Sequence, residues 1–125
     1  PDFRVSLTSQ MTIRQGCGYD IELEVSCFNP GVGRVLLNEP RWVRGAVAFQ
    51  GDIGSYRQYL INHEIGHAIG FAAHEGCGSD GGLAPIMMQQ SFGTANDDIA
   101  GLDPEGVVPR DGLTCRFNPW PYPRA

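Results

Sequence analysis

The sequence lacks a run of 18 apolar residues, has few basic side chains and contains no CxxC pair. The missing apolar run excludes a membrane-spanning helix within these 125 residues. The nine Lys and Arg residues are scattered, form no basic stripe and leave a net charge of −5, so we expect no nucleic-acid partner. The chain begins at Pro1 without the charged-then-apolar opening of a signal peptide, which is typical of a mature domain or an excised fragment.

The length of the chain predicts a single domain over residues 1–125 that can bury a core without help from a metal. Its character changes near residue 70. We expect a sheet and a long helix in residues 1–70, a loop-rich half in residues 71–125, and a monomer in solution.

Four cysteines are present, an even number, and none lies in a CxxC pair, which argues against a redox motif or a thiolate zinc site. Three pairings are available. We expect Cys17–Cys27, which would clamp a local excursion, and Cys77–Cys115, which would tie the C-terminal tail to the loop after the histidines. Disulfides favour an oxidising, extracytoplasmic compartment; four reduced thiols in a cytosolic protein are the alternative.

Alternating apolar and polar residues predict strands at Phe3–Thr8 and Ile21–Val25. A third strand is expected at Arg34–Asn38, before Pro40. Ser9–Gln15 is either a helical turn or a loop. Together these segments predict a small twisted, mostly antiparallel sheet.

A long helix is predicted after the strands. Ser55 opens an S-x-x-Q capping box, and no proline follows before Gly70, which is the expected C-terminal cap of about four helical turns. The helix carries two apolar faces and should be packed on both sides. A short helix is expected from Thr94, as its N-cap, through Leu102. These elements predict an α+β fold, with the sheet packed on the long helix.

All three histidines of the chain lie in one segment of twelve residues. His63 and His67 are four apart on the predicted helix, so their rings can converge on one Zn²⁺ ion. Glu64 would point beside the metal, where a general base takes a proton from the zinc-bound water as it attacks a carbonyl. This chemistry is amide-bond hydrolysis. For HExxH alone, an exposed histidine pair without a metal is the other interpretation.

The HExxH motif, the following glycine, a third histidine and a downstream methionine resemble the metzincin metallopeptidases. The resemblance implies that Gly70 turns the chain out of the helix, that His74 is the third zinc ligand and that Met87 forms the Met-turn beneath the metal. Three residues separate Gly70 from His74, where the clan has two, and Glu75 is the alternative ligand. Core filling is the alternative role of Met87 and Met88.

The same resemblance implies further roles near the metal. Gln89 replaces the tyrosine of astacins and serralysins, and is either an oxyanion donor or a solvated loop residue. The acidic residues of Asn96–Leu102, a segment similar to one in matrix metalloproteinases, are expected to be structural. The strand Arg34–Asn38 would border the cleft. The loop Gln90–Thr94 would form one wall of the substrate pocket, with Phe92 lining it.

Over nearly its whole length the chain also resembles an actinobacterial family of secreted or envelope-associated proteins of unknown function. The similar segments include Tyr56–His67, Met87–Gln90 and Asn118–Pro121. The metzincin resemblance implies a zinc-dependent endopeptidase with a peptide or protein substrate, and the resemblance to the actinobacterial family supports the fold and a location outside the cytoplasm. The alternatives are a zinc hydrolase of a cell-wall amide and a catalytically inert zinc-binding or interaction domain.

Overall fold

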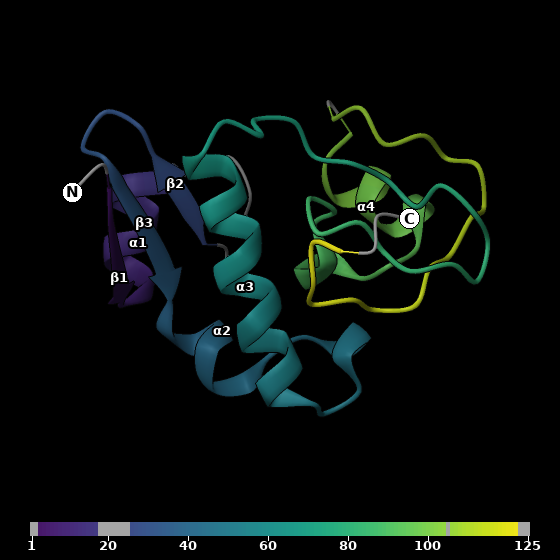
Figure 1. Cartoon of the computed structure of the whole chain (residues 1–125), viewed down its shortest axis with the longest axis horizontal. Helices are drawn as coiled ribbons and strands as arrows, with labels where there is room; N and C mark the ends of the chain where they lie inside the picture. Colours follow the sequence, from purple (N-terminus) through teal and green to yellow (C-terminus); the bar gives the residue numbers. More distant parts are fainter. Residues whose placement is uncertain (1–2, 18–25, 105, 123–125) are drawn as a thin grey trace.

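The computed structural model describes residues 3–17, 26–104 and 106–122 and has an α+β fold (Figure 1). A small sheet lies at one end, the long helix α3 runs through the middle, and a loop-rich half follows it. No helix in the described part is long and apolar enough to cross a membrane. The elements are β1 Arg4–Thr8, α1 Gln10–Cys17, β2 Cys27–Asn29, β3 Arg34–Asn38, α2 Glu39–Arg44, η1 Val47–Phe49, α3 Ile53–Ala68, η2 Gln90–Phe92 and α4 Asn96–Leu102.

The sheet is mixed, with the strand order β1-β3-β2. The central strand β3 pairs in parallel with β1 and antiparallel with β2. The prediction of a mostly antiparallel sheet was therefore wrong, because helix α1 follows β1 and allows β3 to run in the same direction as β1. The strands predicted at Phe3–Thr8 and Arg34–Asn38 are confirmed as β1 and β3. The segment Ser9–Gln15 belongs mainly to α1. The predicted strand Ile21–Val25 lies outside the described residues.

The helix that carries two of the histidines begins at Ile53, two residues before the predicted capping box. Its N-cap is Asp52, which accepts a hydrogen bond from the Ser55 backbone N–H at 3.0 Å and one from the Ser55 hydroxyl at 2.7 Å. These bonds, the hydroxyl bond above all, lower the pKa of Asp52. The prediction that Ser55 opens a capping box was wrong, because Ser55 instead donates hydrogen bonds to Asp52, the N-cap one turn earlier. The N-cap of α4 is likewise Ala95 and not Thr94.

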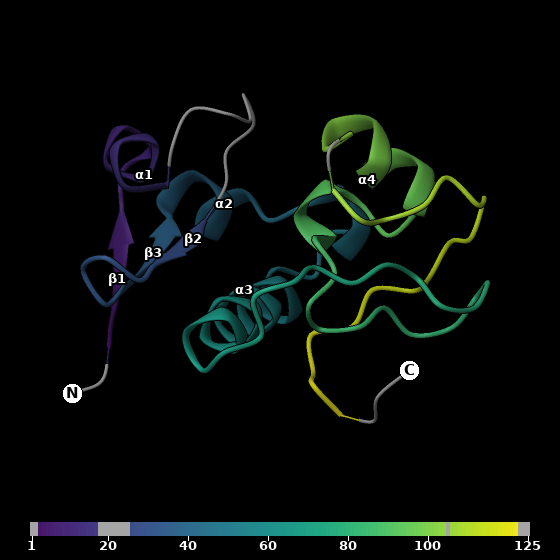
Figure 2. The same ribbon diagram turned by 90° about the horizontal axis from the view of Figure 1, so that it is seen from above.

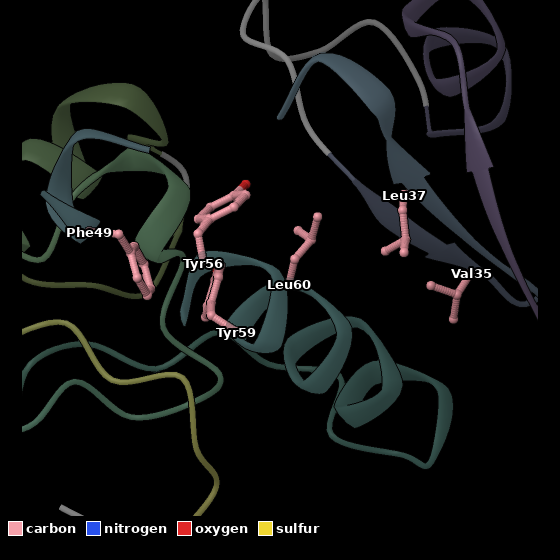
Figure 3. Close-up of a cluster of buried hydrophobic side chains, with 6 residues drawn as sticks. All are labelled: Val35, Leu37, Phe49, Tyr56, Tyr59 and Leu60. Atoms are coloured by element: carbon pink, nitrogen blue, oxygen red, sulfur yellow. The ribbon is translucent and has the colours of Figure 1, made fainter. Parts of the chain in front are cut away.

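Helix α3 packs against the sheet on one side and against the loop-rich half on the other. The shared core contains Leu60, which lies between the strand side chains and the aromatic residues (Figure 3). The core residues that are drawn are Val35, Leu37, Phe49, Tyr56, Tyr59 and Leu60.

The loop-rich half has a second core, built around the disulfide between Cys77 and Cys115. The buried side chain of Asn96 accepts a hydrogen bond from the Cys77 N–H at 2.7 Å and donates one to the Cys77 carbonyl at 3.0 Å. Asn96 thus fixes the loop that follows the third histidine. The other predicted disulfide, Cys17–Cys27, joins α1 to β2, so both predicted pairings are confirmed.

Candidate metal and catalytic site

Three histidines form a cluster that could hold a metal ion. His63 and His67 lie one turn apart on α3, and His74 lies on the loop that follows; their ligand nitrogens are all within 4.8 Å of one another. The Nε2 atoms of His67 and His74 are 3.1 Å apart. Two nitrogens bound to one tetrahedral zinc ion at ordinary bond lengths lie about 3.3 Å apart. The spacing of the cluster therefore fits a single ion.

Two of these rings are oriented by backbone carbonyls. His63 Nδ1 lies 2.8 Å from the Ile86 carbonyl oxygen, and His67 Nδ1 lies 2.8 Å from the Phe71 carbonyl oxygen. A carbonyl only accepts, so each Nδ1 carries the proton and donates it. Each Nε2 is then left with a lone pair facing the cluster. Histidines that bind metals in proteins are usually oriented in this way.

The environment keeps the three rings neutral. Burial lowers the pKa of His63 to about 3 and that of His74 to about 4, and it also lowers the pKa of His67. A neutral imidazole is the form that binds a metal ion. Protons therefore do not compete with a metal for this cluster at neutral pH.

Glu64, next to the first histidine, is buried, with 4% of its surface exposed. Its Oε2 atom is fully buried and has no hydrogen-bond partner in the part of the chain that the structure describes. Burial raises the pKa of Glu64 to about 8. A buried polar atom without a partner costs free energy and is retained where a ligand supplies the partner.

The cluster and Glu64 share a cavity of about 570 Å³. Edge strand β2 lies on the side of the sheet nearest the loop-rich half (Figure 2) and contributes to its wall. The prediction that Arg34–Asn38 borders the cleft was wrong, because that strand is β3 and β2 separates it from the cavity. Gln89 and Phe92 also line the cavity, and Phe92 belongs to the loop Gln90–Thr94 that was expected to form one of its walls. The lining residues are Cys17, Ser26, Cys27, Phe28, Pro30, Tyr59, Leu60, His63, Glu64, His67, Ala72, His74, Gln89, Ser91 and Phe92.

Met87 packs against α3 between the first two histidines. A Cβ atom at Gly66 would lie 2.5 Å from the Met87 sulfur, so only glycine permits this close approach. Met87 is buried, and the preceding residue, Ile86, supplies the carbonyl that orients His63. The turn that contains Met87 therefore both supports the helix and orients a histidine. No role for Gly66 was predicted, since the HExxH motif does not require a glycine at that position.

Buried polar residues that the sequence did not single out hold this turn in place. The Tyr59 hydroxyl donates to the Met88 carbonyl at 3.1 Å and accepts from the Gln90 N–H at 2.9 Å. The Gln90 side chain and the Asn118 backbone exchange two hydrogen bonds, of 2.8 and 2.9 Å. The only sequence signal was polarity beside the methionine pair, which is equally typical of a surface loop.

Replacing Gly70 with alanine is expected to lower the free energy of unfolding by about 1–2 kcal/mol. Gly70 follows α3 with φ of 117°, which L side chains rarely adopt, although no atom lies within 4 Å of the position of a Cβ. The cost is backbone strain alone. Gly78 has the same open space without a positive φ, and Gly78→Ala is the matched control. Urea unfolding gives the free energy of unfolding of both variants. An equal loss in the two variants would contradict the assignment of the cost to the positive φ of Gly70.

The metal-free protein is expected to be most stable near pH 6.5. Between pH 4.5 and 8 the folded protein holds a proton on Glu64 that the unfolded chain has lost, which lowers stability by up to about 1.4 kcal/mol per pH unit as pH rises. His63 and His74 act in the opposite direction below pH 6.5, where the unfolded chain binds their protons first. Below pH 6.5 the two histidines outweigh the one carboxyl, so stability rises with pH. Above pH 6.5 the effect of Glu64 dominates, so stability falls as pH rises.

Thermal unfolding of chelator-treated protein from pH 6 to 8.5 tests this profile. The decline above pH 6.5 should disappear in Glu64→Gln, which has no titrating group at that position. A decline of the same size in the variant would show that another group causes it.

Residues 1–123 match a family described as a protein of unknown function (DUF3152). Searches of curated proteins and of solved structures give no match. The chemistry of the site must therefore be inferred from its own residues.

Proposed function

The chain belongs to the DUF3152 family, and from its site we propose that it is a zinc-dependent endopeptidase that works outside the cytoplasm. One observation carries the proposal. Three histidines and the unpartnered carboxylate oxygen of Glu64 converge in one cavity. Three protein ligands with a fourth position left open are typical of catalytic zinc sites, and three imidazoles are one of their donor sets.

The zinc ligands in this proposal are His63, His67 and His74, each through Nε2. Zinc held there would supply a coordinated water with a pKa near 7 and would polarise the carbonyl of the substrate. His74 serves as third ligand in spite of the longer loop. The next residue, Glu75, donates its backbone N–H to the Met87 carbonyl at 3.1 Å, which ties the loop to the Met-turn. Glu75 lies outside the three-residue cluster.

Glu64 is the proposed general base. Its Oε2 accepts a proton from the water that attacks the scissile carbonyl and then delivers it to the amide nitrogen, which leaves as an amine. Burial favours the protonated form of Glu64, whereas a cation close by favours the carboxylate that this role requires. A metal ion bound at the histidines would therefore lower the pKa of Glu64 and favour its carboxylate form.

Two features support a metzincin-type arrangement. Met87 packs beneath the histidine pair against Gly66, as a Met-turn residue would. The C-cap of α3 is Ile69 and not the predicted Gly70, which comes next with a positive φ and redirects the chain toward His74. Both features belong to the motif on which the resemblance rests.

A peptide is the substrate that the cavity walls favour. Cys27 and Phe28 of β2 line the cavity, and β2 is an edge strand of the described sheet. An extended peptide can pair with such an edge and so lay its backbone across the metal site. The two disulfides support an oxidising compartment, in the envelope or outside the cell.

Hydrolysis assays test the proposal. Zinc-loaded protein is incubated with denatured casein and a peptide library, and in parallel with muropeptides. We expect internal cleavage of peptides that a chelator abolishes and added zinc restores. Turnover of muropeptides alone would identify a cell-wall amide hydrolase instead, and the absence of chelator-sensitive activity on any substrate would indicate an inert zinc-binding domain.

A further inference from the structure

We propose that a second cavity, behind His74, binds a basic side chain of the substrate; this inference rests on the proposed peptidase function. The cavity measures about 200 Å³ and shares Ala72, His74 and Gln89 with the larger cavity. The two cavities are therefore neighbours, separated by the third histidine and the residues beside it. The lining residues are Ala72, Ala73, His74, Gln89, Ile99, Asp103, Gly106, Val107 and Val108.

The chemistry of this lining fits a long aliphatic stem that ends in a cation. Ile99, Val107 and Val108 present apolar surface, and Asp103 supplies the only carboxylate among the described lining residues. Lys and Arg bury their methylene stems on apolar surface while the charged group binds a carboxylate or water. An apolar pocket with one well-placed polar group is the usual form of a specificity site.

The Asp103 carboxylate lies in this cavity, close enough to His74 to interact with it electrostatically. The backbone of Asp103 is held on both sides, by a hydrogen bond from its N–H to the Ile99 carbonyl at 2.8 Å and one from the Gly106 N–H to its carbonyl at 3.0 Å. None of the described residues that line the cavity is a Lys or Arg. A Cβ atom at Gly106 would lie 2.7 Å from Asp103 Oδ2, so the glycine leaves room for the carboxylate.

The position of the cavity places it beside the bond to be cleaved. A peptide whose scissile carbonyl lies at the histidines passes close to the partition formed by His74 and Gln89. A side chain near that bond can then enter the second cavity. Ala73, in the loop that is one residue longer than the metzincin spacing, lines this cavity and not the larger one.

The first experiment measures kcat/KM for peptides that differ only in carrying lysine, norleucine or glutamate at one position near the scissile bond. We expect lysine to be preferred over norleucine by about tenfold at one such position, as for a hydrogen bond to a charged group. Asp103→Asn should remove the preference, and Asp103→Lys should favour glutamate. Asp98→Asn is the matched control, because Asp98 is an exposed acid on α4 outside both cavities.

A binding experiment separates this inference from the proposed function. The lysine and norleucine peptides are titrated by calorimetry into the zinc-loaded Glu64→Gln variant, with and without Asp103→Asn. Tighter binding of lysine that depends on Asp103, without hydrolysis by the wild type, would support the cavity and overturn the peptidase proposal. Hydrolysis with equal binding of both peptides, or with a lysine preference that survives Asp103→Asn, would overturn the cavity assignment alone.

Discussion

Replacing Glu64 with glutamine is expected to lower kcat/KM for peptide hydrolysis by about 10³-fold while zinc remains bound. Glutamine has nearly the same shape as glutamate but cannot accept the proton of the attacking water. Among the described residues that line the large cavity, Glu64 is the only carboxylate. The variant should therefore bind peptide and metal but not cleave.

Two measurements on the same samples check this prediction: the rate of peptide cleavage and the zinc content by elemental analysis. Glu39→Gln is the control, since Glu39 is an exposed carboxylate on α2, outside the cavity. It should keep full activity. Retained activity in Glu64→Gln would exclude its role as the base, and a loss of zinc together with activity would point to a ligand or structural role.

Replacing His74 with alanine is expected to weaken zinc binding by about 10²–10³-fold, which is one ligand's share of a typical site affinity. His74 Nε2 lies 3.1 Å from His67 Nε2, as expected for two ligands of the same ion. Competition with a chelator of known affinity gives the dissociation constant. Activity at saturating zinc should fall as well, because the remaining two histidines position the ion poorly.

Glu75→Ala is the matched control for His74→Ala. Its side chain lies outside the histidine cluster, and the backbone bond from Glu75 to Met87 does not depend on that side chain. We expect its zinc affinity to change by less than about threefold, because the half-buried Glu75 side chain is not a ligand in the proposed site. The reverse result, with a large loss in Glu75→Ala and little in His74→Ala, would make Glu75 the ligand.

The parts of the site that the sequence predicted well are those that depend on local geometry. His63, Glu64 and His67 lie on one helix, and the period of a helix alone places the two histidines on the same face. The strand at Arg34–Asn38 also follows from a local pattern. Cys17–Cys27, the short-range disulfide, is local in the same sense, because its cysteines are only ten residues apart.

Errors arose where two local patterns competed or where the path of the chain decided the outcome. Asp52 and Ser55 both satisfy the preferences of an N-cap, and only the folded chain shows that Asp52 caps the helix. Strand direction is not encoded in the alternation of side chains, so the parallel pairing of β1 with β3 was missed. The placement of Arg34–Asn38 beside the cleft came from the metzincin resemblance, whereas β2 lines the cavity.

Long-range contacts account for what the sequence could not provide. Gly66 matters because Met87 packs against it from 21 positions away along the chain. The Gln90–Asn118 pair joins segments 28 residues apart. Asp103 follows α4 and has no motif, and only the fold places it in a cavity with His74. Such residues are ordinary polar or small residues until the tertiary structure brings them together.

The coordination of the bound metal tests the central claim most directly. A crystal structure of the zinc-loaded protein, with anomalous diffraction measured on both sides of the zinc edge, identifies the ion and its ligands. We expect one zinc ion bound by Nε2 of His63, His67 and His74 at about 2.0–2.1 Å, with an oxygen ligand facing Glu64. A site that leaves out His74, or a protein that binds no zinc under these conditions, would contradict the proposal.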